Sequence, residues 1–113
     1  ATVARLEGVL DRWGPDVDVF VSFDLDAVVG TVAPGVSCPG VLGLSAPEAL
    51  ALCMAAGRHP RVRLFDLSEY NPDVEDYRTG KLVATMFYYF LLGLRQRQLA
   101  SEPGNGKEEG VKS

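Results

Sequence analysis

The spacing of apolar residues divides the first part of the chain into a helix and a strand. Apolar residues recur three or four positions apart near the start of the chain, which predicts an amphipathic helix over residues 2–13. Gly14 and Pro15 are expected to end this helix. Residues 17–23 are rich in β-branched and aromatic side chains and predict a strand. Because apolar side chains occupy both of its faces, we expect it to be buried on both sides, as in a parallel sheet.

The second part of the chain repeats this alternation. Ser45 opens a Ser-Ala-Pro-Glu capping box, which predicts a helix to about residue 56 that ends at Gly57. Residues 62–67 predict a second strand, and residues 77–99 predict a long helix that is apolar in its middle. The order helix, strand, helix, strand, helix predicts an α/β fold with a parallel sheet between layers of helices.

Two segments lack a regular pattern. Residues 27–44 contain four glycines and two prolines, and a loop of this length is expected to serve a function. Its apolar residues predict that it packs against the rest of the molecule. Residues 99–113 are polar and rich in glycine and are predicted to form a disordered tail, which leaves residues 1–98 as the folded part. The chain opens inside a predicted helix, so we expect it to be part of a longer protein.

Composition argues against several kinds of partner. The 113 residues carry a formal net charge of −4 without a basic patch, which argues against a nucleic-acid partner. The most apolar run, residues 82–94, falls short of the roughly 20 residues that span a bilayer, so no membrane partner is expected. Cys38 and Cys53 show neither disulfide-framework nor zinc-site spacing, which favours free thiols in the cytoplasm.

Acidic and polar residues follow both predicted strands. Asp24 and Asp26 come at the end of the first strand, and Ser68, Glu69 and Asn71 come just after the second. Parallel strands place their carboxyl ends at one edge of a sheet, where α/β proteins bind ligands. The two groups are therefore expected on one rim. Because two neighbouring carboxylates repel each other, the Asp24/Asp26 pair needs a compensating partner.

Four interpretations of the Asp-x-Asp pair compete. One aspartate can cap a turn while the other is solvated. A phosphoryl-transfer site of the dehalogenase-like kind also begins with Asp-x-Asp, but Gly-Thr follows too late here and a matching lysine is missing. A sugar-nucleotide site has no other support in the chain. A divalent cation would remove the repulsion and suits oxygen ligands. His59, at the opposite end of the second strand, is expected to be a surface residue rather than a ligand, and the acids at positions 73, 75 and 76 are expected to be a solvated loop face.

Two blocks of sequence carry a family resemblance. The block SFDLDAVVGTVAPGVSCPGVLGLSAPEAL resembles the signature of the ureohydrolase superfamily, which includes arginase, agmatinase and formimidoylglutamase. A second block, LFDLSEYNPDVEDYRTGKLVATMFYYFLLG, resembles that family's Glu-x-Asn-Pro segment and its following helix, and the 43 residues from Asp26 to Glu69 suit the family spacing. Val29-Gly30 replaces the usual third acid and proline. This departure makes the chain most similar to formimidoylglutamases.

The resemblance implies a fold, a reaction and roles for individual residues. The fold would be the arginase-like three-layer α/β fold, and the reaction would convert N-formimidoyl-L-glutamate and water to L-glutamate and formamide. Two Mn²⁺ ions would activate the water, with Asp24 bridging both and Asp26 binding one. Glu69 would face the cationic amidine of this small-molecule substrate. The Ala33–Pro39 loop would shape the pocket, with Ser37 as a polar contact.

The resemblance also implies what this chain lacks. The family's remaining metal ligands come from histidine- and aspartate-containing motifs in its N-terminal half, and neither motif occurs here. We therefore interpret the chain as the C-terminal portion of a ureohydrolase that is a homo-oligomer when complete, and expect the portion alone to be inactive. Two alternatives remain: a guanidine hydrolase of the arginase or agmatinase type, or a non-catalytic fragment that associates with intact subunits.

Overall fold

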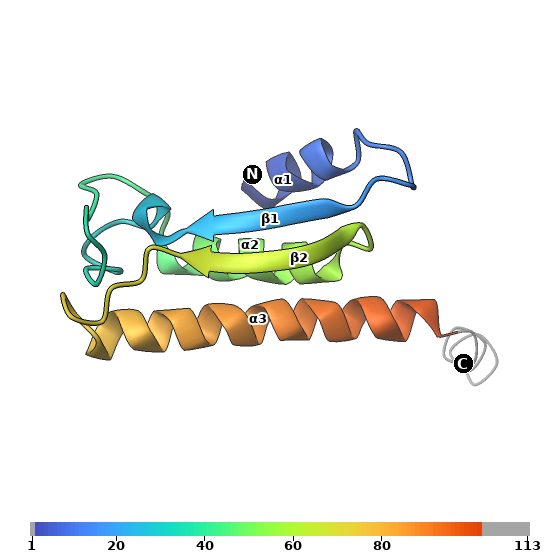
Figure 1. Cartoon of the computed structure of the whole chain (residues 1–113). Coiled ribbons are helices and arrows are strands. Elements are labelled where there is room, and N and C mark those ends of the chain that lie inside the picture. Colours follow the sequence, from blue (N-terminus) through green and yellow to red (C-terminus); the bar gives the residue numbers. More distant parts are fainter. Residues whose placement is uncertain (1, 103–113) are drawn as a thin grey trace.

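The chain folds as a parallel β-α-β unit preceded and followed by helices (Figure 1). The computed structural model describes residues 2–102. Its elements are α1 (Thr2–Leu10), β1 (Val19–Asp24), the 3-10 helix η1 (Leu25–Ala27), α2 (Ala46–Arg58), β2 (Val62–Ser68) and α3 (Tyr77–Ser101). The register runs from Val19 beside Val62 to Asp24 beside Ser68. The predicted order of elements and the parallel pairing are confirmed.

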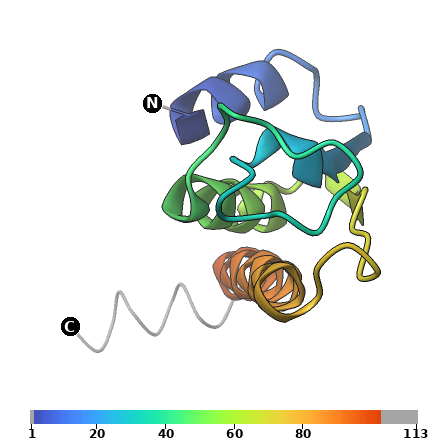
Figure 2. The same cartoon turned by 90° about the vertical axis from the view of Figure 1, so that its left-hand side faces the viewer.

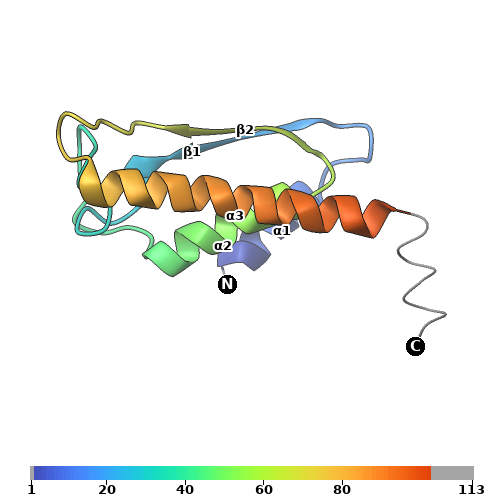
Figure 3. The same ribbon diagram turned by 90° about the horizontal axis from the view of Figure 1, so that it is seen from below.

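All three helices lie on the same side of the two-stranded sheet (Figures 2 and 3). Side chains alternate between the two faces of a strand, so only every second residue of β1 meets the helices. On the other face, Phe20 is 56% exposed and its cross-strand partner Leu64 is 58% exposed. The α/β class is confirmed, but burial of the first strand on both faces is wrong for the part of the chain that the structure describes, which covers one face.

The core lies between the covered face of the sheet, α2, α3 and the long loop. Its buried residues are Phe23, Leu25, Val28, Ala33, Val36, Ala49, Cys53, Leu82 and Met86. Val28 and Val36 belong to the 27–44 loop, which confirms that this loop packs against the rest of the molecule. The ring of Phe65 on β2 stacks on Phe90 of α3 with centroids 4.4 Å apart. Burial raises the pKa of the Cys53 thiol to about 12, so this cysteine is a protonated core residue.

Helix α2 begins as predicted. The Ser45 side chain accepts a hydrogen bond from the Glu48 backbone N–H, and the Glu48 carboxylate accepts one from the Ser45 N–H at 2.9 Å. This reciprocal capping box satisfies two backbone donors that the helix itself leaves unpaired. Pro47 in the first turn adds a backbone angle already suited to the helix.

The end of α2 differs from the prediction, because Gly57 lies inside the helix and not after it. A Cβ atom on Gly57 would come within 2.1 Å of the Phe90 carbonyl oxygen on α3. Reciprocally, a Cβ atom on Gly93 would come within 2.1 Å of the Met54 carbonyl oxygen on α2. Both glycines are therefore explained by the close approach of the two helix backbones and not by a helix end.

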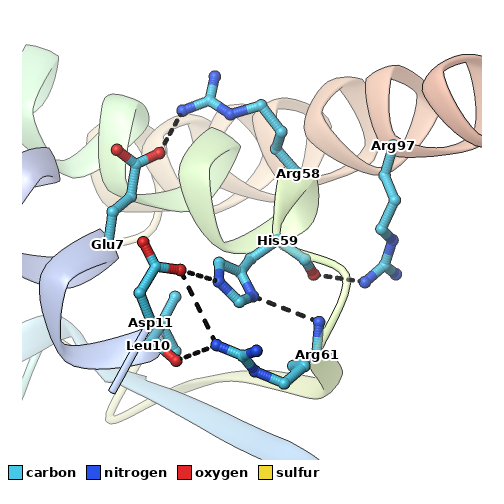
Figure 4. A network of polar contacts seen from close by, with 7 residues as sticks. All are labelled: Glu7, Leu10, Asp11, Arg58, His59, Arg61 and Arg97. Atoms are coloured by element: carbon cyan, nitrogen blue, oxygen red, sulfur yellow. Dashed lines mark hydrogen bonds and ion pairs between the residues drawn. The ribbon is translucent and has the colours of Figure 1, made fainter. Parts of the chain in front are cut away.

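Polar contacts join α1 to the turn between α2 and β2 (Figure 4). Helix α1 ends at Leu10, three residues before the predicted end, and the Arg61 guanidinium donates to the Leu10 carbonyl oxygen. The Nε2 atom of His59 lies 3.0 Å from the Asp11 carboxylate, and the His59 side chain is only 10% exposed. The prediction that His59 is a surface residue is therefore wrong. His59 does lie, as predicted, before the first residue of β2, at the strand end opposite the Asp-x-Asp pair.

The Glu75 side chain binds the first turn of helix α3, and the helix extends into the predicted tail. The Glu75 carboxylate accepts hydrogen bonds from the backbone N–H groups of Arg78 and Thr79, so Glu75 is not a solvated loop residue as predicted. The helix continues to Ser101, and residues 103–113 lie outside the described part. No helix between residues 2 and 102 is both long and apolar enough to cross a membrane.

Candidate metal and substrate site

Asp24 and Asp26 meet where β1 passes into η1. Asp24 is the last residue of β1, and its Oδ1 atom accepts a hydrogen bond from the Asp26 backbone N–H at 2.8 Å. This contact makes Asp24 the cap of the 3-10 turn that contains Asp26. The Asp24 carboxylate and the Asp26 backbone are therefore joined by a capped turn, and not by the i, i+2 alternation of an extended strand from which we predicted that the two carboxylates are close.

One oxygen of this pair lacks a protein partner. The Oδ1 atom of Asp26 is buried and accepts no hydrogen bond from the described residues. A buried carboxylate oxygen without a donor is costly, and a bound cation would remove that cost. Carboxylate oxygens are ligands for hard divalent cations such as Mg²⁺ and Mn²⁺. The Asp24/Asp26 turn therefore favours a bound metal ion over the alternative in which one aspartate caps the turn and the other is solvated.

The described residues supply only part of a metal site. Between residues 2 and 102, no group of three or more His, Cys, Asp and Glu side chains is arranged to hold an ion. His59 lies with Asp11 and Arg61 at the opposite end of β2, so the histidine cannot complete the Asp24/Asp26 pair (Figure 4). Further ligands would have to come from residues other than those described.

Glu69 follows β2 in an unusual backbone conformation. Its φ angle of 71° lies in the left-handed region, and it is the one non-glycine residue with positive φ between residues 2 and 102. Such a conformation costs about 1–3 kcal/mol and persists where the surrounding structure enforces it, often at functional sites. Because Asp24 pairs with Ser68, Glu69 leaves the sheet one residue beyond the position opposite Asp24. The structure thus confirms that both acidic groups lie at one end of the sheet.

The loop that carries Ser37 covers the same end of the sheet (Figures 1 and 2). Ala33 and Val36 are buried, whereas Ser37 and Cys38 are exposed. The Asn71 backbone N–H donates to the Gly35 carbonyl oxygen at 2.7 Å and so attaches this loop to the segment after Glu69. The predicted site residues are therefore on neighbouring segments, with Ser37 presented to solvent.

The acidic residues that surround the site have other partners than expected. Asp66 accepts a hydrogen bond from the Ser22 hydroxyl at 2.7 Å on the exposed sheet face. Asp76 accepts one from the Tyr70 hydroxyl. That hydrogen bond, with the nearby negative charge, raises the pKa of Tyr70 to about 12. The contact between Tyr70 and Asp76 therefore joins two parts of the loop between β2 and α3, whereas the Asp66 contact joins the two strands.

A hollow of about 830 Å³ lies elsewhere, between β2 and the first turns of α3. It is lined by Phe65, Leu67, Tyr70, Asp76, Tyr77, Gly80, Lys81, Val83, Ala84 and Phe87. None of Asp24, Asp26, Glu69 or Ser37 lines it. We therefore locate the candidate site from the carboxylates of Asp24 and Asp26, and not from the position of this hollow.

Sequence reasoning missed one buried polar residue next to the site. Thr79 has no exposed surface, and its hydroxyl accepts a hydrogen bond from the Gly35 N–H at 2.7 Å. The only sequence signal was a Glu-x-x-x-Thr spacing at the start of a helix, which is common to many helix N-termini. The contact with a residue 44 positions away could not be read from that spacing.

Comparison with known proteins gives the family. The model of the Arginase family matches residues 2–93, and the chain therefore belongs to the arginase family. Within it, the chain is similar to a formimidoylglutamase of Cupriavidus pinatubonensis, with 39% identity over 90 residues that cover 80% of this chain and 28% of the relative. The resemblance to ureohydrolases, and to formimidoylglutamases in particular, is confirmed.

Solved structures agree with this assignment. Trypanosoma cruzi formiminoglutamase, determined with Mn²⁺, superposes with a TM-score of 0.80 at 43% identity over 86% of this chain and 33% of that protein. The agmatine ureohydrolase of Thermoplasma volcanium, with a TM-score of 0.74 and 21% identity over 88% of this chain and 33% of that chain, shares the fold. The chain thus spans about a third or less of the length of these relatives, and its fold is a partial arginase-like α/β fold.

Proposed function

We propose that the protein to which this chain belongs is a metal-dependent amidine hydrolase that converts N-formimidoyl-L-glutamate and water to L-glutamate and formamide. The observation that carries this proposal is the buried Oδ1 atom of Asp26, which has no partner among the described residues and follows Asp24, the cap of the same turn. The similarity to formimidoylglutamases supports the choice of substrate. The proposal includes residues 1–98 as part of one catalytic domain, a cytoplasmic location and homo-oligomeric assembly.

Asp24 and Asp26 would be among the side chains that hold two Mn²⁺ ions. When bound, the two ions supply a water molecule that is activated as a nucleophile at neutral pH. The Asp26 N–H fixes the orientation of the Asp24 carboxylate through its Oδ1 atom. Because η1 begins at that hydrogen bond, the same contact fixes the backbone that carries the Asp26 carboxylate.

Glu69 would bind the reacting end of the substrate. An amidinium group presents parallel N–H donors, which one carboxylate accepts in a two-pronged hydrogen bond. Glu69 has a left-handed backbone and follows Ser68, which pairs with Asp24, so it lies at the end of the sheet where Asp24 lies. Holding the amidine carbon in one orientation there lowers the entropic part of the barrier to attack. Ser37, exposed on the neighbouring loop, would contact the remainder of the substrate.

The test begins with the gene. The coding sequence upstream of Ala1 should encode further histidine- and aspartate-containing motifs, and the longer protein should be expressed with Mn²⁺. N-formimidoyl-L-glutamate, arginine and agmatine are then assayed side by side for release of formamide or urea. Formamide release that Asp26→Asn abolishes supports the proposal. Turnover of arginine or agmatine in preference would overturn the choice of substrate and identify a guanidine hydrolase.

The 113-residue chain serves as a second test. We expect it to release no formamide with Mn²⁺, because Asp24 and Asp26 are too few ligands for two ions. Manganese-dependent activity of this chain alone would contradict that expectation. Co-purification of the inactive chain with an intact ureohydrolase, whose manganese content stays constant, would instead favour a non-catalytic associating fragment.

A further inference from the structure

The Thr79 side chain makes two hydrogen bonds from a fully buried position in the first turn of α3. Its hydroxyl oxygen accepts from the Gly35 N–H at 2.7 Å and donates to the Oε1 atom of Glu75 at 2.6 Å. A threonine hydroxyl has one proton to donate and lone pairs to accept with. Because the N–H can only donate and the carboxylate can only accept, the direction of both hydrogen bonds is determined. A hydroxyl is therefore required at this position.

Glu75 fixes the orientation of the Thr79 hydroxyl. The same Glu75 carboxylate accepts the Thr79 backbone N–H at 2.8 Å and the Arg78 backbone N–H at 2.7 Å, so it cannot rotate freely. These contacts, first among them the Thr79 hydroxyl, hold the pKa of Glu75 below its ordinary value. The ionised carboxylate in turn makes the Thr79 oxygen a better acceptor for the Gly35 N–H.

Gly35 is held from both sides of its backbone. Its N–H is bound by Thr79, and its carbonyl oxygen accepts the Asn71 N–H at 2.7 Å. A Cβ atom at Gly35 would lie 2.1 Å from the Glu75 carbonyl oxygen, so only glycine allows this approach. Gly35 therefore attaches the loop both to the segment between β2 and α3 and to the first turn of α3.

Two candidate substrate contacts lie close in sequence to this attachment. Ser37 is two residues after Gly35, and Glu69 is two residues before Asn71. We propose that Thr79, oriented by Glu75, is a positioning residue that sets the spacing between Ser37 and Glu69 and hence how tightly the substrate binds. The kinetic consequence rests on the proposed amidine hydrolase function, whereas the attachment of the loop does not.

The test compares Thr79→Val with Thr79→Ser in the complete protein loaded with Mn²⁺. Valine has nearly the shape of threonine without the hydroxyl, whereas serine keeps the hydroxyl. With Val, we expect amide hydrogen exchange over residues 33–39 to rise roughly tenfold, the effect of one lost buried hydrogen bond. The KM for N-formimidoyl-L-glutamate should rise by a similar roughly tenfold factor, with a smaller change in kcat and unchanged manganese content. In the Thr79→Ser variant, both the amide exchange rate of the loop and the KM should stay close to the wild-type values.

Several outcomes would overturn this role. Equal loop exchange in the Val and Ser variants would show that the hydroxyl does not hold the loop. Faster exchange with an unchanged KM would show that the attachment does not position substrate. If the wild-type protein hydrolyses no amidine, the proposed function fails, and loop exchange alone decides the attachment. Should Thr79→Val not fold, Glu75→Gln replaces it and is expected to raise exchange and KM in the same direction by less.

Discussion

The backbone N–H of Asp26 donates a hydrogen bond to the Oδ1 atom of Asp24 at 2.8 Å. This contact ends β1 and starts η1, so the element boundary and the candidate metal site are the same structural feature. It uses one oxygen of Asp24 and leaves the Oδ1 atom of Asp26 buried without a partner among the described residues. One backbone hydrogen bond thus holds Asp24 and Asp26 in a single turn, as expected of a candidate site whose side chains are fixed by the surrounding protein.

Asp26→Asn should reduce manganese binding in the complete protein. The change removes the negative charge while keeping the size of the side chain. Removing a residue that only supports a metal ligand typically lowers metal affinity roughly 10–100-fold. Because Asp26 is proposed to bind the metal directly, we expect a loss of manganese affinity at least as large. Manganese content after dialysis, measured by mass spectrometry, and formamide release should fall together.

The matched control for Asp26→Asn is Asp66→Asn. Asp66 undergoes the same change of charge but pairs with Ser22 on the exposed face of the sheet, and an amide oxygen can still accept the Ser22 hydroxyl proton. Its manganese content should match the wild type. Equal loss of manganese in both variants would show that the effect is general electrostatics, and the assignment of Asp26 as a ligand would be wrong.

The order of elements could be predicted because each element has a local signal. The Ser45–Glu48 capping box and the β-branched run before Asp24 are signals that extend over only a few residues. The helix start and the strand that they predicted are both confirmed. Gly57 was misjudged because the local rule for helix ends competes with tertiary packing. Its neighbour Phe90 lies 33 positions away in sequence, and no local pattern contains that contact.

Two aspects of the site depended on information outside the local sequence. Glu69 has a left-handed backbone directly after β2, and a glutamate gives no sign of it because that conformation is uncommon for non-glycine residues. The face of the first strand that carries Phe20 was expected to be buried, but it is exposed. That expectation follows correctly from the pattern, but a pattern of apolar residues does not say which other segment covers them.

Gly57→Ala and Gly93→Ala should each destabilise the fold. Each added methyl group would lie 2.1 Å from a backbone carbonyl oxygen of the facing helix, and a backbone oxygen cannot move aside without separating α2 from α3. The cost of such overpacking is about 1–3 kcal/mol of the free energy of unfolding. Urea unfolding followed by circular dichroism measures it as a lower midpoint.

Gly8→Ala is the control for these two substitutions. Gly8 also lies inside a helix, α1, but a Cβ atom there would meet nothing within 4 Å. Alanine at a free helical position should stabilise the protein by roughly 0.5–1 kcal/mol. If Gly8→Ala lowers the urea midpoint as much as Gly57→Ala does, close helix approach is not the cause.

Arg97→Met should weaken the attachment of α3 to the turn before β2. The Arg97 guanidinium donates to the carbonyl oxygens of His59 and Val62, the latter at 2.9 Å (Figure 4 shows the contact with His59). Removing the donor leaves partly buried carbonyl oxygens unpaired, at an expected cost of about 1–3 kcal/mol. Arg95→Met changes an exposed residue of the same helix and should have little effect on the urea midpoint. Equal effects would indicate that charge or helix propensity is responsible.

Stability should fall on acidification because of Glu48. The Ser45 backbone N–H, and secondly the Thr2 hydroxyl, hold the pKa of Glu48 below its ordinary value of 4.5. A carboxylate with a lowered folded-state pKa contributes stability that is fully present above its unfolded pKa. That contribution is lost as the pH falls through the folded-state pKa, because the folded protein must then take up the proton.

Glu48→Gln isolates this contribution. The glutamine keeps a side-chain oxygen that can accept the Ser45 N–H, but it does not titrate. The wild type should be the more stable of the two at neutral pH, and the difference in urea midpoint should shrink between roughly pH 5 and pH 3. Glu102→Gln, at an exposed position after α3, should show no such closing difference. A wild-type advantage that persists unchanged at pH 3 would mean that Glu48 stabilises α2 through its shape and not through its charge.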